Sequence, residues 1–133
     1  MNKNLFINLS NHPSIKWSKK QLLAVNDLFD DDNEVEIHDI QFPQIDPNLK
    51  FTQIKKLAND FANDIFNIED DDNLIVHVMG ETSFVVAFVN IMLQNICRIV
   101  VSTTERKVVE TTDENGNTIK NVVFEFNQFR EIF

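Results

Sequence analysis

The sequence is poor in the features that mark secreted and membrane proteins. It has a single cysteine among 133 residues, so no disulfide can form within the chain. Asn90 interrupts the longest apolar run, which is far shorter than the roughly 20 residues that a membrane-spanning helix needs. No basic segment followed by an apolar one opens the chain, as a secretion signal would. We therefore expect a cytoplasmic protein without a membrane partner.

Positive charge is also scarce. The 12 Lys and Arg residues face 21 Asp and Glu residues, which gives a formal net charge of −9. Binding to long DNA or RNA rests on many contacts between Lys or Arg and phosphates, so we expect no such partner. A short phosphorylated ligand stays compatible with this charge, because a few local donors and helix N-termini can hold one.

The common metal and cofactor motifs are missing. No CxxC, HxxxH or HExxH pattern occurs, and the acidic runs at residues 30–32 and 70–72 lack the spacing of an EF-hand. The glycine patterns of dinucleotide-binding and P-loop proteins and the GxSxG turn of hydrolases are missing too. We therefore expect neither a metal nor a cofactor.

What the sequence does contain is an alternation of short and long apolar segments. Short segments rich in β-branched residues predict strands, and longer ones with an apolar residue every three or four positions predict helices. Strands are expected at residues 4–9, 35–38, 74–79 and 96–101, and helices at residues 19–28, 52–66 and 84–93. This order predicts an α/β fold, a Rossmann-like three-layer sandwich with a mainly parallel sheet, as a single domain over residues 1–133.

Local signals predict where several elements begin and end. Ser18 is expected to cap the first helix, and Asp46 with Pro47 to begin the second. Asn115 and Gly116 predict a hairpin between strands at residues 107–112 and 119–126, added antiparallel at one edge of the sheet. The tail, residues 129–133, ends in apolar side chains and is expected to dock on the body.

Polar segments follow two neighbouring strands of the predicted sheet. One consists of Gly80, Glu81, Thr82 and Ser83, and the other of Ser102, Thr103, Thr104, Glu105 and Arg106. Both are expected as turns at the carboxyl edge of the sheet, where α/β folds bind ligands at the switch point in strand order. A helix capped by Thr82 or Ser83 would offer free N–H groups to an anion, and hydroxyls and Arg106 would bind phosphate or ribose.

Each of these segments also has a purely structural interpretation. The first can be a routine turn from strand to helix, and the second a polar loop in which Arg106 pairs with Glu105 or Glu110. His12 follows Ser10 and Asn11 after the first strand. It can act as an acid or base near neutral pH, or it can be a surface histidine without a functional role. His77 lies inside an apolar strand and is expected to be a satisfied core histidine.

Three stretches carry a resemblance to a known family. The stretches HVMGETSFVVAFVNIML, IVVSTTERKVVE and VVFEFNQFREIF resemble the small stand-alone CRISPR-associated ring nucleases with a CARF-like, Rossmann-type fold. In those proteins a strand ends in Gly-Glu before a helix, a later strand ends in a Thr-Thr-Glu-Arg-like turn, and the chain closes on Phe-Arg. The likeness covers residues 74–133, with NLSNHP near the start as a weaker match. The chain departs from many ligand-binding CARF domains in lacking their lysine and glycine-rich turn.

The resemblance implies a homodimer that binds cyclic oligoadenylate, the second messenger of type III CRISPR immunity, at its interface. It implies cleavage without metal, by attack of a ribose 2′-hydroxyl on the adjacent phosphodiester, to linear products with a 2′,3′-cyclic phosphate. The implied catalytic residues are His12, Thr104 and Arg106, and the implied ligand-binding residues are Ser10, Asn11, Gly80, Glu81, Thr82, Ser83, Ser102 and Thr103. The residues alone leave two other interpretations open, a non-catalytic nucleotide-binding module and an interaction subunit.

Overall fold

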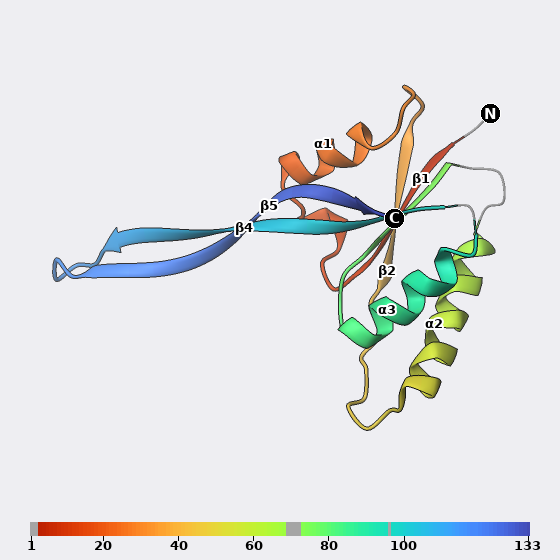
Figure 1. Ribbon diagram of the computed structural model, residues 1–133. Coiled ribbons are helices and arrows are strands. Elements are labelled where there is room, and N and C mark those ends of the chain that lie inside the picture. The colour runs from red at the N-terminus through yellow and green to blue at the C-terminus, as the bar shows by residue number, and fades with distance from the viewer. Residues whose placement is uncertain (1–2, 69–72, 96) are drawn as a thin grey trace.

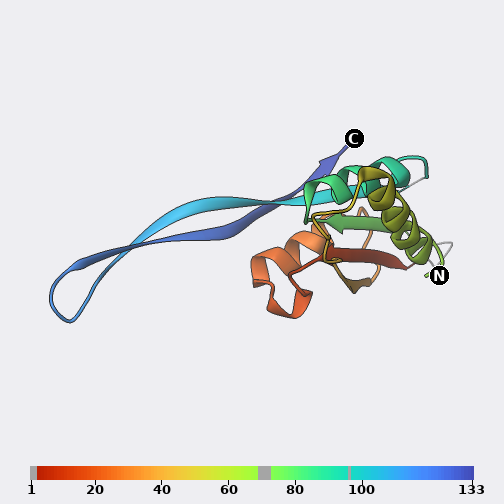
Figure 2. The ribbon, with the colours of Figure 1, turned by 90° about the horizontal axis from the view of Figure 1, so that it is seen from below.

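The computed structural model describes residues 3–68, 73–95 and 97–133, and these form an α/β sandwich around one mixed sheet. The strands are β1 (Asn4–Ser10), β2 (Val35–Gln41), β3 (Asn73–Val78), β4 (Arg98–Thr112) and β5 (Thr118–Ile132). The helices are α1 (Lys19–Asp27), α2 (Phe51–Phe66) and α3 (Thr82–Met92), with a short 3₁₀ turn, η1 (Ser14–Lys16), before α1. Figures 1 and 2 show α1 on one side of the sheet and α2 and α3 on the other. The predicted Rossmann-like fold is therefore confirmed.

The strand order is β2-β1-β3-β4-β5, with β1 to β4 parallel and β5 antiparallel to β4. All seven residues of β1 are buried, as its central place requires. Alternate side chains of β1 enter two cores, with Leu5, Ile7 and Leu9 on the side of α2 and α3, and Phe6 on the side of α1. The chain leaves β1 toward β2 and leaves β3 toward β4, so the strand order reverses between β1 and β3. Their carboxyl ends form the switch point.

The largest departure from expectation concerns residues 102–106, which form no turn. They belong to β4, which continues to Thr112 and pairs with β5 along its length. Thr and Val are good strand formers, so the chain stays extended until it meets Asn115 and Gly116. The turn itself is as predicted, with Gly116 at φ 78°. A bulge interrupts the pairing where Thr103 faces Gln128 and Thr104 faces Phe126. Beyond it, residues 104–126 form a two-stranded ribbon, here called the arm, that projects from the body (Figure 1).

Of the predicted helix caps, that of α1 is confirmed and those of α2 and α3 are wrong. Ser18 caps α1 as expected, because its Oγ accepts a hydrogen bond from the Gln21 backbone N–H at 3.2 Å. Asp46 and Pro47 do not begin α2; the helix starts at Phe51, after Lys50. Thr82 and Ser83 do not cap α3 either, because the Glu81 carboxylate takes that role.

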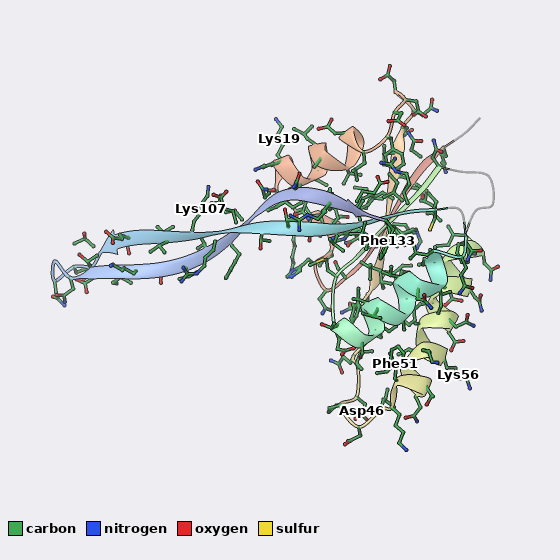
Figure 3. All side chains as sticks on the ribbon, in the orientation of Figure 1. Lys19, Asp46, Phe51, Lys56, Lys107 and Phe133 are labelled. Carbon is green, nitrogen blue, oxygen red and sulfur yellow. The ribbon has the colours of Figure 1, made fainter. Side chains whose placement is uncertain are left out.

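The apolar tail docks as an extension of β5, which pairs with β4 as far as Ile132. Phe129 is buried, whereas Phe133 lies in solvent at the end of the chain (Figure 3). Helix α1 covers its face thinly, since Val25 is its only residue that is fully buried. The acidic link at residues 69–72 and the predicted strand start at Ile96 lie outside the described residues. Among those described, no helix is both long and apolar enough to span a membrane.

Candidate functional site

A pocket of about 440 Å³ opens at the switch point, on the face of the sheet that carries α1. Four segments line it: the end of β1 with its loop, η1 with the start of α1, the end of β3, and the base of the arm. The lining residues are Ser10, Asn11, His12, Lys16, Trp17, Gln21, His77, Met79, Gly80, Ser102, Thr104, Phe124 and Phe126. The lining combines hydroxyls, two imidazoles, an ammonium group and aromatic rings.

This pocket gathers about half of the candidate residues from the sequence. The candidates that line it are Ser10, Asn11, His12, Gly80, Ser102 and Thr104. Glu81, Thr82, Ser83, Thr103 and Arg106 do not line it. Three segments far apart in the sequence therefore converge as expected, although two of them contribute fewer side chains than expected.

Glu81 occupies the helix terminus that was expected to attract a phosphate. Its carboxylate accepts hydrogen bonds from the backbone N–H groups of Ser83 and Phe84, at 3.1 and 2.9 Å, and from the Ser83 hydroxyl at 2.6 Å. The Ser83 hydroxyl and these N–H groups lower the pKa of Glu81. A negative charge already sits at the start of α3, so an anionic ligand there would meet repulsion.

Gly80 is explained by packing. A Cβ atom added to it would lie 2.3 Å from the ring of Phe42, which is buried and packs edge-on against Phe84 with ring centroids 4.9 Å apart. The residue must therefore lack a side chain whatever the pocket binds.

Two candidates on β4 do not line the pocket, Thr103 and Arg106, and they differ in whether their side chains already have bonding partners. The Thr103 hydroxyl donates to the Gln128 carbonyl and accepts from its N–H, both at 3.2 Å, so it is used by the bulge. Arg106 is exposed on the arm, on the same side of β4 as Thr104. It forms no ion pair within the described residues, and Glu110 pairs with Lys120 instead. The alternative in which Arg106 pairs with Glu105 or Glu110 is therefore wrong.

A row of polar side chains that the sequence did not reveal lies beneath the pocket. Asp39, Asn8 and His77 stand side by side on β2, β1 and β3 because of the strand register. The Asn8 Nδ2 donates to Asp39 Oδ1 at 2.8 Å and to the His12 carbonyl at 2.9 Å. Asn8 Oδ1 must then be the acceptor of its contact with His77 Nδ1, at 2.9 Å. His77 therefore carries its proton on Nδ1, and its Nε2 is a bare acceptor.

His77 is satisfied on one side of its ring only. It is 2% exposed and lies among Phe6, Trp17 and Phe129, with ring centroids 5.3 to 6.1 Å away. Its Nε2 has no hydrogen-bond partner among the described residues. Burial, with a smaller contribution from the charge of His12, lowers the pKa of His77 to about 4. The prediction of a core histidine is confirmed, but not that of full satisfaction.

The loop that carries His12 is fixed by its backbone. The His12 carbonyl accepts hydrogen bonds from Asn8 Nδ2, from Trp17 Nε1 at 3.1 Å and from Ser10 Oγ at 3.3 Å. The His12 N–H donates to Ser10 Oγ at 3.2 Å. The imidazole stands exposed at the pocket, on a backbone that cannot shift without breaking several bonds. This arrangement suits an acid–base group that must be held in place.

Among the described residues, no group of three or more His, Cys, Asp or Glu side chains could hold a metal ion.

Comparison with known proteins shows which family the chain belongs to. No curated protein matches the chain. The sequence model of the uncharacterized protein MJ1673 family matches residues 4–130, which is nearly the whole chain, and the protein therefore belongs to that family.

Proposed function

We propose that the protein is a cytoplasmic, homodimeric ring nuclease that binds cyclic oligoadenylate in the switch-point pocket and cleaves it without metal, ending type III CRISPR signalling. The resemblance of residues 74–133 to ring nucleases motivates this function. The observation that carries it is the convergence in one pocket of Ser10, Asn11 and His12 with Gly80 and with Ser102 and Thr104. Nothing in the family match itself names an activity.

The pocket lining suits a nucleotide. The hydroxyls of Ser102 and Thr104 can hydrogen-bond to ribose or phosphate, and the Lys16 ammonium can pair with a phosphate despite the net charge of the chain. Phe124 is 66% exposed and offers a face on which a base can stack, a contact worth about 1–3 kcal/mol per base. A lining with both kinds of group fits a short nucleotide better than a purely apolar ligand.

The proposed reaction is a transfer within the ligand. The ribose 2′-oxygen forms a bond to phosphorus, the bond from phosphorus to the 5′-oxygen breaks, and a 2′,3′-cyclic phosphate results. The proton of the 2′-hydroxyl passes to a base, and the leaving 5′-oxygen takes one up. In this proposal His12 exchanges these protons and Thr104 orients the phosphate, whereas Arg106, to which the resemblance assigns charge stabilisation, does not line the pocket.

The alternative is a module that binds the nucleotide without cleaving it, as a sensor or a sequestering protein. One observation favours it specifically: Arg106, the residue assigned to stabilise developing charge, does not line the pocket. Of the two histidines that line the pocket, only His12 would then exchange protons with the ligand, because the Nε2 of His77 is buried.

The deciding experiment is incubation of the pure protein with cyclic tetra-adenylate or hexa-adenylate in EDTA, with products separated by chromatography and identified by mass. We expect linear products ending in a 2′,3′-cyclic phosphate. His12→Ala should slow turnover by about 10²–10⁴-fold and leave the Kd from calorimetry nearly unchanged. His38→Ala, which removes an exposed histidine on β2, is the matched control and should match the wild type.

The outcomes separate the two functions. Tight binding with intact ligand at high protein concentration selects the non-catalytic module. Turnover that stops in EDTA and returns with Mg²⁺ contradicts cleavage without metal. Neither binding nor turnover, with both ring sizes, rejects both functions.

A further inference from the structure

The arm exposes apolar side chains on both of its faces. Because neighbours in a strand point to opposite faces, one face carries Val108, Val122 and Phe124, and the other carries Val109, Ile119 and Val123. These six side chains are between 37% and 66% exposed. The face with Phe124 is the more exposed of the two, and it continues into the wall of the pocket. We call it the pocket-side face.

A ribbon of this kind is poorly stabilised by itself. An isolated two-stranded hairpin is marginal in water, and here neither face of the arm is covered by a helix. Within the described residues, pairing between β3 and β4 ends at Val100, so the arm also has two free strand edges. Exposed edges and apolar rows together are features that proteins normally cover.

A second copy of the arm fits this surface in size. From Thr104 to Thr112 the arm reaches about 27 Å, at roughly 3.3 Å per residue. Val108, Val122 and Phe124 are 52%, 45% and 66% exposed, so two pocket-side faces packed on each other would cover six exposed apolar side chains. In a symmetric pair both copies contribute the same pocket-side face, which doubles the apolar surface at the contact.

Charge also favours two arms in antiparallel orientation. Lys107 pairs with Glu125 at 2.8 Å on one face of the arm, and Lys120 pairs with Glu110 at 3.6 Å on the other, so four of its charges are neutralised in pairs. The tip is acidic, with Asp113 and Glu114, whereas Lys19 begins α1 near the base of the arm (Figure 3) and Lys20 follows it in the sequence. An antiparallel pair places each acidic tip over the basic base of the other copy and keeps the two tips apart.

We propose that the arm is the dimerisation element, and that the arms of two copies pack antiparallel through the pocket-side face of Val108, Val122 and Phe124. The inference gives the homodimer of the proposed function a location, and it rests on that homodimer but not on the ligand. The partner's arm would also cover the open side of the pocket next to Phe124.

Light scattering after gel filtration, without ligand, tests this. The wild type should elute as a dimer of twice 15.5 kDa. Val108→Glu combined with Val122→Glu should give a monomer, whereas Val109→Glu combined with Val123→Glu, the same change one position along on the opposite face, should leave the dimer. Val108→Thr combined with Val122→Thr keeps strand-forming residues, and it should raise the dimer Kd at least tenfold while circular dichroism stays unchanged.

A monomeric wild type overturns the proposal. So does a dimer that survives the pocket-side glutamates, or one that the opposite-face pair disrupts equally. If the glutamate variants fail to fold, the threonine pair decides, and an unchanged Kd is then the contradicting result. A wild-type dimer that neither binds nor cleaves cyclic oligoadenylate removes the nuclease proposal and leaves the interface intact.

Discussion

The buried imidazole of His77 makes the stability of the protein depend on pH, and a substitution of this residue isolates its contribution. Its pKa is about 4 in the folded protein, against an ordinary value of 6.5. Between these two values the unfolded chain binds a proton that the folded protein does not. Stability is therefore complete above pH 6.5 and falls as the pH drops toward 4.

The size of the effect follows from the gap between the two pKa values. At about 1.4 kcal/mol per pH unit, the free energy of unfolding should fall by about 2–3 kcal/mol between pH 7 and pH 4.5 on account of this one group. That is a large fraction of the roughly 5–15 kcal/mol by which domains are stable. Because His77 is 2% exposed, solvent screens this effect little.

Urea unfolding followed by the fluorescence of Trp17, the single tryptophan, measures it. His77→Asn keeps an amide N–H near the position of Nδ1, so the bond to Asn8 can persist while the titrating group is gone. The difference in unfolding free energy between the wild type and this variant should shrink by about 2–3 kcal/mol from pH 7 to pH 4.5. His38→Asn removes an exposed histidine and should follow the wild type. Parallel pH curves for the wild type and His77→Asn would refute the reasoning.

Three further changes test the packing and capping described above. Gly80→Ala drives a Cβ into the Phe42 ring and should lower the free energy of unfolding by about 1–3 kcal/mol, a loss that Phe42→Leu in the same chain should partly relieve in urea titrations. Glu81→Gln should lower the Tm at pH 7, and this deficit should shrink in thermal scans below pH 4.5, because a carboxylate with a lowered pKa stabilises only while ionised. Arg98→Ala breaks contacts of 2.9 and 2.6 Å with Glu131 and should cost about 1 kcal/mol, with faster amide exchange near the end of β5; unchanged exchange would contradict it.

Most of the fold could be read from hydrophobic periodicity, because the body of the protein has an inside and an outside. The helix predicted at residues 52–66 differs from α2 by one residue, since a clean apolar stripe faces the core. The same logic is wrong at residues 102–106, where the polar side chains predict a turn although the residues belong to β4. In the arm both faces meet solvent, so polarity no longer tells a strand from a turn.

The position of the candidate site could be predicted from the sequence, but the hydrogen bonds that support it could not. The switch point follows from the order of elements, and this located His12, Gly80 and Ser102 at one edge. The row of Asp39, Asn8 and His77 was not predictable, because it depends on the register between strands that are 31 and 69 residues apart in sequence. An asparagine inside an apolar strand is a usable signal, because a buried amide needs partners, but the sequence does not say which.

The pocket lies where the sheet is least well covered. Helices α2 and α3 bury four and five residues fully, and they close their face with an apolar core. On the other face α1 fully buries Val25 alone, so Trp17, Phe126 and the base of the arm cover the carboxyl ends of β1 and β3. Polar groups there must bond to one another, and the resulting chain from Asp39 through Asn8 to the His12 carbonyl ties the proposed catalytic loop to the edge strand β2. Asp39→Ala should therefore weaken ligand binding without touching the pocket, whereas a site formed by the loop alone would not respond.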